Sequence, residues 1–402
     1  VPLDMSKQRI TNKIKNKFKI AAEAQKENKM NALLQTQERG CIVLEDGEQY
    51  PTQKFIRKNV ACSVKEKAFS LDLEEDCWKS SYSLDGRHII LHSRSVVAAF
   101  DCKTLNVFFE RTLRNIETSI FLHNEQYCAI ASDTLFIYNK NGLEVHHLSH
   151  ERNVRQMVYL PHHFLLVTLS DQPFIRYLDT SMGKEVAKLY IKEPSCGALS
   201  RRDDGIVLVG GTRGVVRFFS PNAKEPLCSL LVNSSKISSI AVKKNNFVCS
   251  SLQGTNFYDF RNLNEPVYRL PKSENVSLSH VLAMSYKNRI TTFLNGTEYV
   301  KETYQSINSI EFAPYEDILA VGTKNGLSHM IVPGAGDPNI DFYEDSPFLT
   351  KKQRREREIK KLMEKIPSSF IGSKFIVEEV VEEENEEKKD EPRKRTALSR
   401  FY

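Results

Sequence analysis

Five basic side chains within the segment TKKQRRERE at 350–358 could neutralise phosphate groups or contact an acidic protein surface. They are Lys351, Lys352, Arg354, Arg355 and Arg357. Contacts between such side chains and phosphates supply much of the affinity for nucleic acid without reading its base sequence. A solvated, charged helix face has the same composition, so charge alone leaves both interpretations open.

The segment just before this basic run, VPGAGDPN at 332–339, has the composition of a loop. Its glycines permit positive φ and its prolines remove backbone donors, so no helix or strand can continue through it. A phosphate-binding loop places Lys-Ser or Lys-Thr after its last glycine, whereas Asp337-Pro338 follows here. The sequence therefore argues against nucleotide binding by this loop.

A helix is predicted from Lys351 onward, ending before Pro367. Thr350 is a suitable N-cap, and Gln353 stands where it would complete a capping box. Apolar residues share one face of the second half at the i, i+3, i+4, i+7 spacing, namely Ile359, Leu362, Met363 and Ile366. We expect this stripe to dock inward, while the basic first half faces a partner.

A second basic segment, residues 5–39, holds nine Lys or Arg against three Glu and has few β-branched residues, which indicates a helix. Its apolar stripe is too narrow to hold a long helix on a core, so we expect it to be ordered against a partner. Packing on the chain's own body is the alternative. Its candidate contacts with RNA or protein are Lys13, Lys15, Lys17 and Lys19.

The charge of the chain is segregated, although the formal net charge is only +6. Residues 378–391 carry nine Asp or Glu against two Lys. This acidic tract could bind a basic partner or screen the basic segments. A solubilising, disordered tail is the simpler interpretation of the same composition.

No motif indicates an enzyme, a metal site, a cofactor or a small-molecule substrate. The eight cysteines include no C-x-x-C pair, which suits a reducing intracellular compartment. H-E-x-x-H and G-x-S-x-G are absent, and no apolar run is long enough to cross a membrane. A hydrolase that used a central channel would need carboxylates or histidines converging there.

Residues 60–332 show the pattern of an all-β fold built from repeats. Short apolar runs alternate with turn dipeptides, and the end of one strand recurs at intervals of 38 to 41 residues. A period near 40 with four short strands predicts a seven-bladed WD-repeat β-propeller, although no Trp-Asp pair is present. The recurring pairs are Phe100-Asp101, Tyr138-Asn139, Leu178-Asp179, Phe219-Ser220 and Tyr258-Asp259.

The last unit ends at Val332 after about three strands, and the sixth unit is short. A propeller closes by completing its last blade with a strand from the other end of the chain, and residues 67–73 alternate suitably for that role. The predicted organisation is a basic helical extension (1–59), a propeller (60–332), a loop with a basic helix (333–377) and a charged, disordered tail (378–402).

Several segments, in the same order along the chain, resemble a known family. They are LHNEQ at 122–126, LPHHFLLVT at 160–168, FSP at 219–221, EPL at 225–227, FAPYEDIL at 312–319, VPGAGDPN at 332–339 and TKKQRRERE at 350–358. The chain resembles the nucleolar WD-repeat protein of the small-subunit processome, the U-three-snoRNA-associated protein seven family. The resemblance covers most of residues 5–375 and excludes the acidic tract.

This resemblance implies a non-enzymatic assembly factor in the nucleus and nucleolus that serves pre-18S rRNA processing and early small-subunit assembly. The implied partners are pre-18S rRNA, the box C/D snoRNP and other processome proteins, including WD-repeat proteins. It also implies essential extensions that thread between subunits. The alternative is a WD-repeat interaction module of another nuclear protein or RNA complex.

Overall fold

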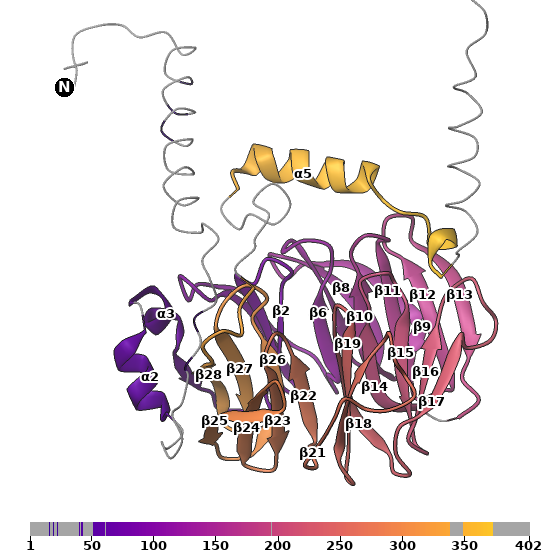
Figure 1. Ribbon diagram of the computed structural model, residues 1–402. Helices are drawn as coiled ribbons and strands as arrows, with labels where there is room; N and C mark the ends of the chain where they lie inside the picture. The colour runs from indigo at the N-terminus through magenta and orange to yellow at the C-terminus, as the bar shows by residue number, and fades with distance from the viewer. Residues whose placement is uncertain are drawn as a thin grey trace, which may run out of the picture.

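The computed structural model (Figure 1) describes residues 51–60, 62–193, 195–337 and 349–372, together with a few single positions, namely Asn16, Lys19, Ala22, Gly40 and Ile42. Within these residues the chain forms seven four-stranded antiparallel sheets, which confirms the predicted seven-bladed β-propeller. No helix in the described part is both long and apolar enough to cross a membrane.

In the first three blades the strands pair in chain order. Blade 1 consists of β2 (Lys79–Tyr82), β3 (His88–His92), β4 (Val96–Asp101) and β5 (Val107–Thr112). Blade 2 consists of β6 (Thr118–Phe121), β7 (Tyr127–Ala131), β8 (Thr134–Asn139) and β9 (Glu144–Arg152). Blade 3 consists of β10 (Val154–Leu160), β11 (Leu165–Ser170), β12 (Phe174–Asp179) and β13 (Lys184–Tyr190).

The next three blades follow the same order, and blade 6 has four strands although its repeat is short. Blade 4 consists of β14 (Ser195–Arg201), β15 (Val207–Gly211), β16 (Val215–Phe219) and β17 (Cys228–Leu231). Blade 5 consists of β18 (Ile237–Lys243), β19 (Asn246–Ser251), β20 (Thr255–Asp259) and β21 (Tyr268–Leu270). Blade 6 consists of β22 (Asn275–Leu278), β23 (Leu282–Tyr286), β24 (Arg289–Leu294) and β25 (Thr297–Thr303).

Blade 7 joins the two ends of the propeller. Its inner strands are β26 (Ile307–Phe312), β27 (Ile318–Thr323) and β28 (Gly326–Ile331), and its outer strand is β1 (Ser70–Asp72). β1 lies antiparallel to β28 with Leu71 opposite Leu327, inside the segment 67–73 that the alternation had singled out. The ring is therefore closed by hydrogen bonds between segments about 250 positions apart, which removes a free sheet edge.

The core lies between neighbouring blades. The second strands β3, β11 and β27 are buried along their whole length, whereas most residues of the outer strand β13 are exposed. A strand that is covered on both faces needs a continuous apolar run, and LLVTLS and ILAVGT supply one. The short apolar runs of the sequence are thus the middle strands of the blades.

The recurring dipeptides stand at the ends of the third strands, where the chain turns into the fourth. Asp179 ends β12, and its Oδ1 accepts the backbone N–H groups of Ser181 at 2.9 Å and Met182 at 3.3 Å. Asp101 ends β4 and accepts the N–H of Lys103 at 2.8 Å. A short polar side chain that binds the backbone two residues later stabilises such a turn, so the period near 40 marks one turn per blade.

Two short helices cover the outside of the closing blade (Figure 1). They are α2 (Gln53–Asn59) and α3 (Cys62–Lys67). The side-chain amide of Gln53 donates to the carbonyl of Ile331 at 2.9 Å and accepts the N–H of the same residue at 3.1 Å. Ile56 is buried in the same cluster as Met330. Helix α2 thus supplies the hydrogen-bond partners that a further strand would give to the backbone at the end of β28.

His329 of β28 fixes the chain that leads into the closing strand. Its ring is buried, with Nδ1 at 2.8 Å from the carbonyl of Lys67 and Nε2 at 3.3 Å from the hydroxyl of Tyr82. Burial lowers the pKa of His329 to about 4, because the charged imidazolium would lose its hydration there.

This burial predicts a loss of stability on acidification. Between the ordinary histidine pKa of 6.5 and about 4, His329 is protonated in the unfolded chain but stays neutral in the folded one. We therefore expect the His329 contribution to be complete above pH 6.5 and to decline as the pH falls towards 4. Urea denaturation across this range should show a flatter pH profile for His329→Gln than for the parent chain. An equally steep profile in the variant would contradict the assignment.

Candidate nucleic-acid interface

The loop after β28 folds back onto blades 6 and 7. Ala335 is fully buried and its carbonyl accepts the hydroxyl of Ser279 at 2.6 Å. The N–H of Gly336 donates to Asp317 at 2.8 Å, and a Cβ at this position would lie 2.8 Å from the backbone of Glu316. The second glycine of PGAG is therefore required by the close approach of two backbone segments.

The same loop meets the chain that enters the propeller. Gly334 has φ +81°, and a Cβ there would lie 2.6 Å from the carbonyl oxygen of Gly40. The hydroxyl of Tyr299 donates to the carbonyl of Pro333 at 3.0 Å and accepts the N–H of Ile42 at 3.0 Å. One tyrosine thus holds together the places where the chain enters and leaves the ring.

The helix α5 (Lys351–Met363) begins as the sequence predicts. Thr350 Oγ1 accepts the N–H of Gln353, and the side chain of Gln353 accepts the N–H of Thr350 at 2.9 Å. This reciprocal pair is a complete capping box. The helix ends at Met363, which is earlier than the expected stop just before Pro367.

Helix α5 lies over one end of the ring (Figure 1), and polar contacts hold it there. Arg354 forms an ion pair with buried Glu125 of blade 2 at 3.4 Å, and Glu358 contacts Nε2 of His123 at 3.3 Å. Burial lowers the pKa of His123, while the neighbouring carboxylate of Glu358 opposes that shift. The face of α5 that meets blade 2 is therefore charged.

Beyond the helix, the chain is tied to blades 3 and 4. Lys365 forms an ion pair with the carboxylate of Asp179, the same group that stabilises the turn after β12. The N–H of Ile366 donates to the carbonyl of His162 at 3.0 Å. Ile371 is buried in the cluster of blades 3 and 4, and its carbonyl accepts the hydroxyl of Ser220 at 2.8 Å. The C-terminal segment thus spans three consecutive blades.

The prediction that the apolar stripe of α5 docks inward is wrong. The stripe residues are exposed, with Ile359 at 58%, Leu362 at 42%, Met363 at 82% and Ile366 at 42%. The surface beneath α5 offers carboxylates, histidines and carbonyls, so the helix meets it through Arg354, Glu358 and Lys365. Glu125 and Asp179 are largely buried, and without these partners their charges would be left buried and unpaired, so the helix docks by its charged side chains.

The predicted phosphate-contacting residues fall into two groups. Lys351, Lys352 and Arg355 are exposed to solvent. Arg354 and Arg357 are half-buried on the face towards the ring, where both border a small pocket with Glu125. In the N-terminal segment, Lys19 is helical and exposed, whereas Lys13, Lys15 and Lys17 lie outside the described residues.

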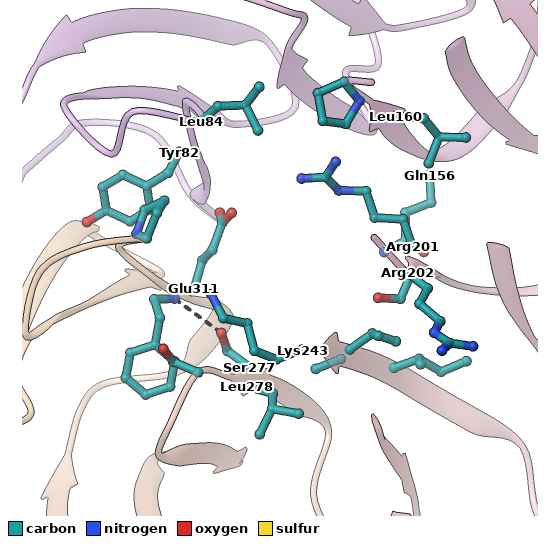
Figure 2. A pocket seen from close by; sticks show the side chains of 18 of the residues that line it. Tyr82, Leu84, Gln156, Leu160, Arg201, Arg202, Lys243, Ser277, Leu278 and Glu311 are labelled. Atoms are coloured by element: carbon teal, nitrogen blue, oxygen red, sulfur yellow. Dashed lines mark hydrogen bonds between the residues drawn. The ribbon is translucent and has the colours of Figure 1, made fainter. Parts of the chain in front are cut away.

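Beneath α5 the ring holds a cavity of about 860 Å³ (Figure 2). The first strands of all seven blades line it, and α5 contributes Arg357, Lys360, Lys361 and Glu364. Its charged residues, which include Arg201 and Lys243, belong to no sequence motif. Both stand at the last position of a blade's first strand. A charged residue at the end of such a strand is the sequence feature that could have identified them.

One group of possible metal ligands lies elsewhere, on the outer strands. Among the residues that the structure describes, His150, Glu151 and Glu185 bring three ligand atoms within 4.8 Å of one another. Glu151 is already paired with Arg176 at 3.0 Å and accepts the hydroxyl of Thr168 at 3.1 Å. The protein's own guanidinium therefore occupies the place that a cation would take.

Comparisons with known proteins agree with this architecture. Residues 298–374, which include β25 to β28, the PGAG loop and α5, match the BING4CT (NUC141) domain. WD repeat-containing protein 46 of Caenorhabditis elegans is 34% identical over 340 residues, which cover 79% of this chain and 58% of the relative. The protein of the same name from Mus musculus is 30% identical over 407 residues, covering 92% and 64%.

A yeast protein belongs to the same set. U3 small nucleolar RNA-associated protein 7 of Saccharomyces cerevisiae is 30% identical over 355 residues, which cover 79% of this chain and 64% of the relative. The chain thus spans 58 to 64% of the length of these curated relatives. WD repeat-containing protein 46 and U3 small nucleolar RNA-associated protein 7 are therefore homologues of this chain over most of its length.

Proposed function

We propose that this protein is a non-enzymatic scaffold of the small-subunit processome, which binds pre-18S rRNA and partner proteins in the nucleolus. The observation that carries the proposal is the orientation of α5. The helix is pinned to the ring by Arg354 and Lys365, and it turns Lys351, Lys352 and Arg355 towards solvent. A rigid base with outward basic groups binds phosphates without selecting bases. The name of the yeast relative, which associates that protein with a small nucleolar RNA, supports an RNA partner.

The exposed stripe on the same helix supports a protein partner as well. Ile359 and Met363 are exposed beside the basic residues. Exposed apolar residues next to positive charge suit a protein surface that combines apolar and acidic groups. In this proposal α5 touches RNA through its N-terminal half and a neighbouring processome protein, such as another WD-repeat protein, through its C-terminal half. The box C/D snoRNP and the N-terminal lysines 13, 15, 17 and 19 remain further proposed contacts.

Charge reversal on the outward face tests the RNA contact. We expect Lys351→Glu, Lys352→Glu and Arg355→Glu together to weaken binding of a pre-18S rRNA fragment by about a hundredfold. The plot of log affinity against log salt should become less steep by about 2 to 3, since each lost phosphate contact reduces the magnitude of its negative slope by about 0.7 to 0.9. Fluorescence anisotropy with labelled RNA at several salt concentrations measures both quantities.

A matched control separates this contact from net charge. Lys184, Arg213 and Lys224 are exposed and belong to blades 3 and 4, so the triple reversal of these residues changes the charge equally. We expect the control to bind RNA within a few-fold of the parent and to co-sediment with pre-ribosomal particles, which the α5 variant should not do. Equal binding by the two variants would overturn the proposed RNA contact.

The alternative is an interaction module of another nuclear protein or RNA complex. Crosslinking in cells followed by sequencing of the bound RNA distinguishes the two. The processome role predicts reads from pre-18S rRNA and small nucleolar RNA. Reads dominated by messenger RNA, or crosslinks to protein alone, would favour the alternative.

A further inference from the structure

Two cationic side chains, Arg201 and Lys243, line the central cavity. Arg201 ends β14 and Lys243 ends β18, and Figure 2 shows both side chains directed into the cavity. Among the described residues no carboxylate forms an ion pair with either side chain, although Asp203 and Asp337 favour their charged forms from a greater distance. Burial lowers the pKa of Arg201 and of Lys243, since each charged form has lost part of its hydration. Such cations are normally paired, so an anion from outside the chain would stabilise them.

The rest of the lining adds to the positive charge. The cavity is lined by eight Lys or Arg and by four Asp or Glu. One of these acids, Glu311, also points into the cavity (Figure 2). Burial raises the pKa of Glu311 to about 8, so its carboxyl group is largely uncharged at neutral pH. It therefore offers an anion a hydrogen-bond donor without repelling it.

Helix α5 forms the roof of this positive chamber. Its Arg357, Lys360 and Lys361 line the cavity together with Arg201 and Lys243. The cations come from two blades and from a helix that follows them by more than 100 residues, so they converge only when α5 is docked. Cations that approach from several directions bind a compact anion with several negative groups better than a single one.

The size and shape of the cavity favour a small ligand over a strand of nucleic acid. A volume of about 860 Å³ is in the range of small-molecule sites and is much larger than one phosphate group needs. A continuous strand would have to pass α5, which lies over the ring at this end (Figure 1). We propose that the cavity binds a compact, multiply phosphorylated small molecule, with Arg201 and Lys243 as its main contacts and α5 as its lid.

Inositol hexakisphosphate is a suitable probe, because it carries many phosphates on a compact ring. We expect titration calorimetry to show one tight site on the full chain, and the probe to raise the melting temperature. The double variant Arg201→Gln with Lys243→Gln should lose about a hundredfold in affinity, because hydrogen bonds to charged groups are worth more than neutral ones. Its ligand-free melting temperature should not fall, since two partly buried charges that form no ion pair with the described residues have been removed.

The control is Arg213→Gln with Lys224→Gln, two exposed residues outside the cavity lining. It removes the same charge and should bind the probe like the parent chain. Parent-like affinity in the cavity variant would overturn the proposal, since the probe would then be held by the outer basic surface. Absence of a tight site on the parent would also overturn it. A short single-stranded RNA that displaces the probe from the parent would show that the cavity accepts a strand, which contradicts the compact-ligand assignment.

Discussion

Replacing Gly326 with alanine is expected to lower the free energy of unfolding by about 3 kcal/mol or more, because it obstructs closure of the ring. Gly326 opens β28 with φ +148°, and a Cβ there would lie 2.0 Å from the carbonyl oxygen of Leu71. That oxygen belongs to the closing strand β1. The added atom therefore forces either β28 or β1 out of register, and the pairing of β1 with β28 depends on that register.

Gly183→Ala provides the matched control. Gly183 also has positive φ, at +66°, but nothing lies within 4 Å of an added Cβ. Its cost should be limited to backbone strain of about 1 kcal/mol. Urea denaturation followed by the fluorescence of Trp78 measures both variants. Hydrogen exchange of the Leu73 amide, which donates to Asn325 across the closure at 2.7 Å, should accelerate in Gly326→Ala alone. Equal losses in the two variants would show that closure tolerates the added atom.

Lys365→Glu is expected to detach α5 from the ring. The ammonium group of Lys365 meets Asp179, whose side chain is only 9% exposed, and the substitution would set two carboxylates against each other. Breaking a largely buried ion pair costs about 3 kcal/mol or more, because one charge stays buried without its partner. Hydrogen exchange of the α5 amides should therefore accelerate by about a hundredfold, while exchange in β11 and β15 stays unchanged.

Lys352→Glu makes the same charge change in an exposed pair within α5 itself. Lys352 and Glu356 lie 3.6 Å apart, with side chains 87% and 62% exposed. Exposed pairs of this kind contribute about 0.5 kcal/mol or less, so exchange in α5 should change by no more than a few-fold. If Lys352→Glu and Lys365→Glu loosened α5 equally, general charge and not the Asp179 contact would hold the helix.

The fold was largely predictable because its determinants are local. Each blade repeats an apolar middle strand and a polar residue that binds the turn after the third strand, as Asp101 and Asp179 do. Such signals recur along the chain and reinforce one another. The capping box of Thr350 and Gln353 is equally local, and the structure contains it. The strand that closes the ring could be located because its alternation matched an incomplete last blade.

The docking of α5 was not predictable, because it depends on residues that converge only in the folded ring. Glu125 and Asp179 belong to different blades, and each looks like an ordinary turn residue in the sequence. The stripe at Ile359 and Met363 therefore suggested apolar docking, although the surface beneath is charged. Arg201 and Lys243 escaped notice for the same reason, since their meeting in the cavity follows from blade geometry and not from spacing.

The hydroxyl of Tyr299, which joins Ile42 to Pro333, gives the two extensions a common origin. When one extension binds an assembly, the other extension is therefore held close to the same assembly, at a high effective concentration. Two contacts that are weak alone then act as one bivalent attachment, and the loss of either weakens the whole by much more than its own share. Release of the protein from an assembly can begin with a single extension, without unfolding of the ring between them.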